Sequence, residues 1–65
     1  MKIADNLKKI RAEKSYSLEK VARLADLSLN TVVKIESGVN KNPTIDTLSK
    51  IAKALEVDVD DLIQK

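Results

Sequence analysis

Apolar side chains recur every three or four positions along this chain, in five short runs separated by polar segments. That period is typical of α-helices with one buried face, and no strand-like alternation persists. None of the expected helices exceeds about 14 residues, so none would be stable alone in water, and all must pack around one shared core. The runs comprise Ile3, Leu7 and Ile10; Leu18, Val21, Ala22 and Ala25; Val32 and Ile35; Ile45, Leu48, Ile51, Ala52 and Leu55; and Val59, Leu62 and Ile63.

Residues that favour helix ends stand at the borders of these runs. Gly38, the only glycine, can take the left-handed conformation that closes a helix, and Pro43 favours a turn in the polar loop that follows. Tyr16, the only aromatic residue, is expected at the edge of an aliphatic core, the alternative being a platform on which bases stack. The sequence therefore predicts an all-α, compact five-helix domain. The expected N-caps are Ser17, Ser28, Thr44 and Asp58.

Composition excludes several classes of function. The chain has 65 residues, enough for a single domain over 1–65, and it contains neither cysteine nor histidine. Disulfides and thiolate metal sites are thereby excluded, and the commonest metal ligand and general acid–base group is missing. Asp60 and Asp61 are adjacent, but their place at a helix start, where the helix dipole favours negative charge, explains them. We expect no enzyme, no metal, no cofactor and no small-molecule substrate.

The sequence also bears on where the protein acts. No apolar run approaches the roughly 20 residues of a membrane span. The Met1–Lys2–Ile3 start soon becomes charged and amphipathic, unlike a signal peptide. A soluble, cytoplasmic protein without membrane contact is the expectation.

Charge is distributed unevenly along the chain. Residues 1–34 hold eight Lys and Arg against four Asp and Glu, whereas residues 35–65 hold four against six. The formal net charge of +2 therefore conceals a basic first half and an acidic second half. Such an imbalance favours an anionic partner for the first three helices. Chance clustering on a solvated surface is the alternative.

The second and third runs are joined by only about three or four residues. So short a connection forces the two helices to cross steeply, as in a helix-turn-helix, here about residues 17–37. The outward residues at the start of the third helix would then project beyond the body of the domain. The major groove of DNA admits such a helix and presents distinct base edges to it. The projecting residues are Leu29, Asn30, Val33 and Lys34.

Two stretches resemble one known family over nearly the whole chain. LKKIRAEKSYSLEKVARLADLSLNTVVKIESG (7–38) is similar to the first three helices of the phage repressor/Cro-like, XRE-type helix-turn-helix DNA-binding domains. NPTIDTLSKIAKALEVDVDDLI (42–63) is similar to their last two. The resemblance implies a lambda-repressor-like fold and sequence-specific binding of double-stranded operator DNA by a transcriptional regulator, repressor-like or redesigned as a DNA binder.

The resemblance also implies roles for individual residues. Base contacts are expected from Leu29, Asn30, Val33 and Lys34. For Asn30 and Lys34 the alternative is an ordinary solvated side chain. Arg11 and Glu36 match a structural ion pair that joins the first and third helices. Phosphate contacts are expected from Ser17, Leu18, Ser28, Thr31, Asn40, Lys41 and Asn42.

The chain departs from the family pattern at several positions. Leu18 stands where the family usually has a glutamine, so a side-chain hydrogen bond to phosphate is lost there. Leu29 is aliphatic where many members are polar, and it could pack on a thymine methyl group or be misplaced apolar surface. Ser15 and Asp26 occupy positions often held by glycine. Both a natural and a redesigned member are compatible with these exchanges.

Two questions stay open at the level of sequence. A contiguous exposed patch of Leu18, Leu29 and Val33 would favour a protein-interaction module on the same fold, antitoxin-like or co-regulatory. The protein could form a homodimer on a two-fold DNA site, as the family usually does, or act as a monomer. The residues proposed to join two copies are Val59, Ile63 or Val39.

Overall fold

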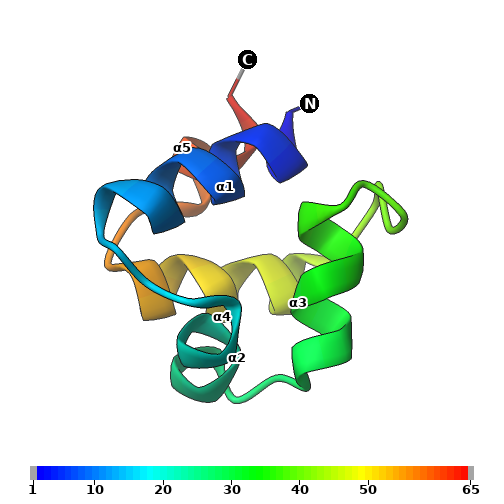
Figure 1. Ribbon diagram of the computed structural model, residues 1–65. Coiled ribbons are helices and arrows are strands. Elements are labelled where there is room, and N and C mark those ends of the chain that lie inside the picture. Colours follow the sequence, from blue (N-terminus) through cyan, green and yellow to red (C-terminus); the bar gives the residue numbers. More distant parts are fainter. Residues whose placement is uncertain (1, 65) are drawn as a thin grey trace.

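The computed structural model describes residues 2–64, so Met1 of the predicted N-terminal start and residue 65 of the predicted domain lie outside it. It contains five α-helices and no strand within those residues, which confirms the predicted all-α, five-helix fold (Figure 1). No helix in residues 2–64 is both long and apolar enough to cross a membrane. The helices are α1 (Ile3–Glu13), α2 (Leu18–Ala25), α3 (Leu29–Glu36), α4 (Ile45–Leu55) and α5 (Val59–Ile63).

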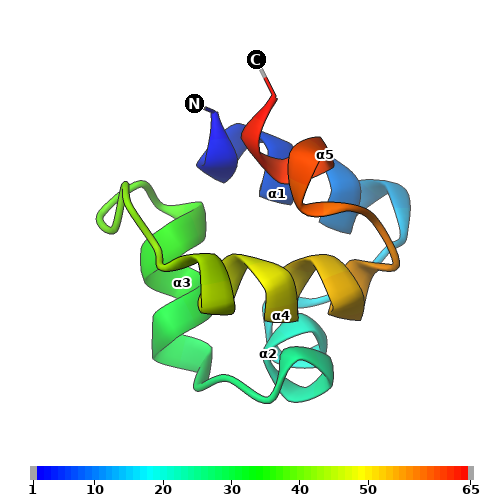
Figure 2. The ribbon, with the colours of Figure 1, turned by 180° about the vertical axis from the view of Figure 1, so that it is seen from behind.

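Helix α4 runs through the middle of the molecule (Figures 1 and 2). Helices α1 and α5 cover one side of it, α2 packs on the other, and α3 closes one end against α1 and α2. All five helices contribute to a single aliphatic core, as their individual shortness requires. The largest side chains with almost no exposed surface are Leu7, Val21, Val32, Ile35, Ile51, Leu55 and Leu62.

Side-chain caps open three of the helices where the sequence predicts them. Ser17, Ser28 and Thr44 each accept a hydrogen bond from the backbone N–H three residues later, at 3.0, 3.1 and 3.2 Å. Asp58 precedes α5, and its N–H donates to the carboxylate of Asp61 at 3.0 Å. These bonds satisfy N–H groups that would otherwise lack partners, and so they set where each helix begins.

Three helices end in the same way, with a left-handed residue that is not glycine. Ser15, Asp26 and Glu56 have φ values of 58°, 57° and 59°. In each case the N–H of the next residue donates back to the carbonyl five positions earlier, at 2.9–3.0 Å, which closes a Schellman motif. The residues that follow are Tyr16, Leu27 and Val57, and all three pack against the core.

Tyr16 therefore lies at the edge of the core, as predicted. Ile45 does not follow the prediction for its run, because 68% of its surface is exposed while Leu48 and Ile51 are buried. It is the first residue of α4, and side chains of a helix lean toward its N-terminus. The helical period places Ile45 on the same side of α4 as Leu48, but no neighbouring helix in the described part of the chain covers that side at the start of α4.

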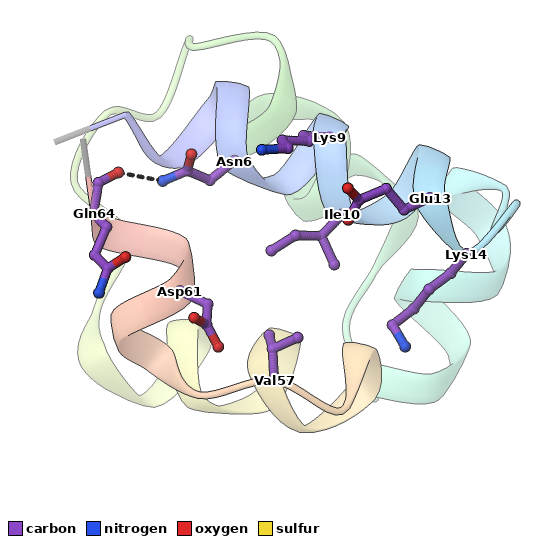
Figure 3. A pocket seen from close by; sticks show the side chains of 8 residues that line it. All are labelled: Asn6, Lys9, Ile10, Glu13, Lys14, Val57, Asp61 and Gln64. Carbon is purple, nitrogen blue, oxygen red and sulfur yellow. Dashed lines mark hydrogen bonds between the residues drawn. The ribbon is translucent and has the colours of Figure 1, made fainter.

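Asn6 of α1 forms hydrogen bonds with the backbone at the end of α5. Its side-chain Nδ2 donates to the backbone carbonyl of Leu62 at 2.8 Å and to that of Gln64, the bond drawn in Figure 3. Leu62 has no exposed surface, so this side chain joins the two ends of the described chain beside a core residue.

The left-handed helix ends generate a stability prediction. Replacing Glu56 with glycine removes the conformational strain of a β-carbon at positive φ, which stabilises the folded state by about 1–2 kcal/mol. Glycine also loses more backbone freedom on folding, which offsets about 0.5–1 kcal/mol of that gain. We expect Glu56→Gly to raise the free energy of unfolding by about 0.5–1 kcal/mol in urea titrations. Gly38→Ala is the converse control and should lower the free energy of unfolding. Gly38 has φ +84°, and an added β-carbon would meet no atom within 4 Å, so the backbone strain is the change that matters. A destabilised Glu56→Gly protein would contradict this account.

Candidate nucleic-acid interface

Helices α2 and α3 meet at a steep corner formed by residues 26–28. Figure 1 views α2 nearly along its axis and α3 from the side. The left-handed Asp26 ends α2, and Ser28 caps α3 two residues later, so the chain has no room for a gradual bend. The buried residues of α2 are all aliphatic, and Ala22 among them keeps only 4% of its surface exposed. The apolar runs of the two helices supply four residues that are all buried in the one core, Val21, Ala25, Val32 and Ile35.

One side of α3 is buried and the other is exposed. Val32, Ile35 and Glu36 face inward, with at most 8% of their surface exposed. The outer face of α3, defined here as Leu29, Asn30, Val33 and Lys34, is exposed along its length. Leu29 and Val33 keep 42% and 37% of their surface accessible. The row of side chains predicted to project from the domain is therefore free to contact a partner.

Arg11 connects α3 to two other parts of the fold. Its Nε donates to Oε1 of Glu36 at 2.7 Å, so the two side chains predicted to pair are in contact. Its NH1 also donates to the backbone carbonyl of Tyr16 at 2.8 Å, a contact that sequence spacing does not reveal. The side chains of Arg11 and Glu36 are 22% and 9% exposed, which shields the pair from water. One guanidinium thus fixes the end of α1, the approach to α2 and the end of α3.

The hydroxyl groups at the starts of α2 and α3 are already engaged. Ser17 and Ser28 act as caps, and the hydroxyl of Thr31 lies 2.7 Å from that of Ser28. An anion at either helix start would therefore bind the first two backbone N–H groups, which have no acceptor within the helix. Leu18 is half-buried against the core, so its side chain offers little to a ligand.

The loop between α3 and α4 carries an exposed lysine. The side-chain oxygen of Asn40 accepts from the N–H of Asn42 at 3.1 Å, which holds the loop in a turn and leaves Lys41 exposed between them. Lys41 and Asn40 line a shallow hollow together with Lys2, at the start of α1. Sequence reasoning missed Lys2, because its proximity to the loop depends on how α1 packs against α3.

Lys20 and Leu18 of α2 both have neighbours within the fold. The Nζ of Lys20 lies 4.5 Å from the centre of the Tyr16 ring, a cation–π contact. The patch of Leu18, Leu29 and Val33 that would favour a protein partner is reduced, because Leu18 packs partly against the core.

A groove larger than the hollow beside Lys41 lies elsewhere on the molecule. It has a volume of about 630 Å³, and its lining includes Lys9, Ile10 and Glu13 of α1 and Asp61 of α5 (Figure 3). No residue expected to contact DNA lines it. Within residues 2–64, no cluster of three acidic, histidine or cysteine side chains could hold a metal ion.

Comparison with known proteins supplies an independent line of argument. The sequence model of the helix-turn-helix family matches residues 7–62, which cover all of α2 to α4 and most of α1 and α5. The chain is similar to the HTH-type transcriptional regulator SinR of Bacillus subtilis (strain 168) and of Bacillus licheniformis, with 33% identity over 63 residues in each case. It is also similar to the HTH-type transcriptional regulator SlrR of Bacillus subtilis (strain 168), with 36% identity over 52 residues.

These relatives are longer than the chain described here. The match covers 97% of this chain but 57% of either SinR protein. It covers 80% of this chain and 34% of SlrR. No solved structure matches the chain at a significant level.

The Arg11–Glu36 pair generates a second prediction. Arg11→Met leaves a mostly buried carboxylate without its partner, and we expect a loss of about 2–3 kcal/mol in the free energy of unfolding. The double variant Arg11→Met/Glu36→Met removes both charges and should recover most of that loss, because no unpaired charge stays buried. Urea unfolding of the three proteins tests this. Equal destabilisation by the single and double variants would show that packing of the arginine, not pairing, dominates.

Proposed function

The chain belongs to the helix-turn-helix family, and we propose on that basis that it binds double-stranded DNA sequence-specifically as a cytoplasmic, repressor-like transcriptional regulator. The observation that carries the proposal is the exposed outer face of α3 on a corner whose inner side is fully buried. A helix held in this way can enter the major groove without rearrangement of the fold. The names of the relatives, HTH-type transcriptional regulators, support the regulatory role.

Base readout is assigned to the outer face of α3. The side-chain amide of Asn30 can donate through its Nδ2 to N7 of an adenine and accept through its Oδ1 from the N6 amino group, a pairing that discriminates by about 1–3 kcal/mol. Lys34, one turn further along, reaches a guanine edge or a phosphate. Glu36 would repel phosphates if it were exposed, but it is buried against Arg11.

Phosphate contacts are assigned to the ends of this surface. The helix starts at Ser17–Leu18 and at Ser28 bring backbone N–H groups and positive helix dipoles to one end. Thr31 lies in the first turn of α3, where its hydroxyl supports the Ser28 cap. At the other end, Asn40, Lys41 and Asn42 belong to a loop in which Lys41 supplies the positive charge. The proposal needs no cofactor, metal or small-molecule substrate.

Two copies on a two-fold site would extend this short interface. A single helix of eight residues reads only about four base pairs, too few for strong selectivity. Val39 has 74% of its surface exposed, and Ile45 follows it across the loop with 68% exposed. Val59 and Ile63, the other residues considered for dimer contacts, are partly buried in their own core. We therefore assign the contact between copies to Val39 and Ile45.

The first test is retention of DNA from a pool of random duplexes at low salt. We expect dissociation constants in the micromolar range or below, and an affinity that falls steeply as salt rises. Lys41→Ala should lower affinity for all duplexes about equally and reduce the log–log salt slope by roughly one unit. Fluorescence anisotropy at several salt concentrations measures both quantities. If no duplex is retained at low salt, the proposed function is wrong.

The second test concerns assembly on DNA. Sedimentation velocity should show two copies on a duplex with two half-sites spaced one helical turn apart, and one copy on a single half-site. Val39→Ser should weaken the second binding event while single half-site affinity is retained. Leu24→Ser is the matched control, because Leu24 is 48% exposed on α2, away from this surface. Independent binding of two copies by the unmodified protein would exclude the dimer.

A further inference from the structure

The outer face of α3 consists of two parallel rows of different chemistry. Leu29 and Val33 are four residues apart, so they lie one above the other on the helix, and they form an apolar row. Asn30 and Lys34 have the same spacing and form a polar row beside it. The hydrogen bonds and charge contacts assigned above do not use the apolar row.

We propose that the Leu29–Val33 row reads the C5-methyl groups of thymines in the major groove, so that the chain selects sites with thymine at one or two defined positions. The proposal rests on the proposed function and specifies its target. Thymine is the base that presents a methyl group in this groove, and an aliphatic side chain is its natural contact. Van der Waals packing on a methyl group requires no hydrogen-bond partner, which neither side chain could supply.

The spacing of the row suits this role. Four residues of α-helix advance about 6 Å along the axis, whereas successive bases of one strand are about 3.4 Å apart. The two side chains can therefore reach methyl groups one or two base steps apart. Leu29 lies in the first turn of α3, the part of a recognition helix that usually contacts base edges, and Val33 follows one turn later.

The surroundings of the row fit DNA better than a protein. Lys34 borders it, and no carboxylate is exposed on α3, since Glu36 is buried with Arg11. A stable protein contact needs about 800 Å² from each partner. Two side chains with 42% and 37% exposure cannot supply an apolar surface of that size, while the half-buried Leu18 adds little to it.

The test replaces each thymine of a selected duplex, one at a time, with deoxyuridine, which removes only the methyl group. We expect affinity to fall about fourfold at one or two positions and to stay unchanged at the others. With Leu29→Ala, the position read by Leu29 should show a thymine-to-uracil ratio near one, while the position read by Val33 should keep its ratio. Val33→Thr replaces one methyl group with a hydroxyl of similar shape. It should lower the thymine-to-uracil ratio at the position read by Val33 and leave the ratio at the position read by Leu29 unchanged.

Leu24→Ala is the matched control, because it truncates an equally exposed leucine outside the proposed interface and should leave every ratio as in the unmodified protein. Circular dichroism melts establish that each variant is folded. Uracil tolerated at every position would overturn the inference, as would a Leu29→Ala protein with an unchanged uracil profile; in both cases DNA binding itself would stand. Absence of binding to any duplex would instead refute the proposed function.

Discussion

The residue after each left-handed helix end packs partly buried against the core, and this contact fixes where the chain turns after α1, α2 and α4. No helix within residues 2–64 exceeds 11 residues, so none holds its direction without the others. At the ends of α1, α2 and α4 the chain reverses through Ser15, Asp26 and Glu56, and the next side chain enters the shared core. The reversal at Asp26 sets the angle between α2 and α3. The outer face of α3 is exposed because its apolar spacing buries Val32 and Ile35, while the packing of Leu27 sets the corner that presents this face.

The same packing explains how a chain with a small net charge can present a suitable surface to an anion. The acidic second half of the sequence ends in α5, which packs on α1 and α4. Glu36, the acidic residue of α3, is turned inward and paired with Arg11. The outer side of α3 is therefore left uncharged or cationic. Net charge alone would have predicted little about a partner.

Much of this architecture was predictable because its determinants are local. A serine or threonine cap acts on an N–H three residues away, and helical spacing identifies Val32 and Ile35 as core residues without reference to the rest of the chain. What escaped prediction depends on packing between segments. Periodicity cannot reveal that Ile45 extends past its neighbours, that Lys2 approaches the loop at Lys41, or that the carbonyl of Tyr16 receives a second bond from Arg11. The proposed DNA contacts remain predictions, because they concern a partner that neither the sequence nor the fold contains.

In the proposed complex with DNA, the two rows on α3 would divide affinity and selectivity between different physical forces. Lys34 and Lys41 would act through charge, which draws in any duplex and weakens as salt screens the phosphates. Leu29 and Val33 would act through close packing, which depends on the shape of one base edge and responds much less to screening by salt. Raising salt should therefore remove nonspecific binding faster than it removes discrimination at a thymine. A rigid corner is what makes this division effective, since a mobile helix could withdraw its apolar row from an unsuitable site while its lysines stayed on the backbone.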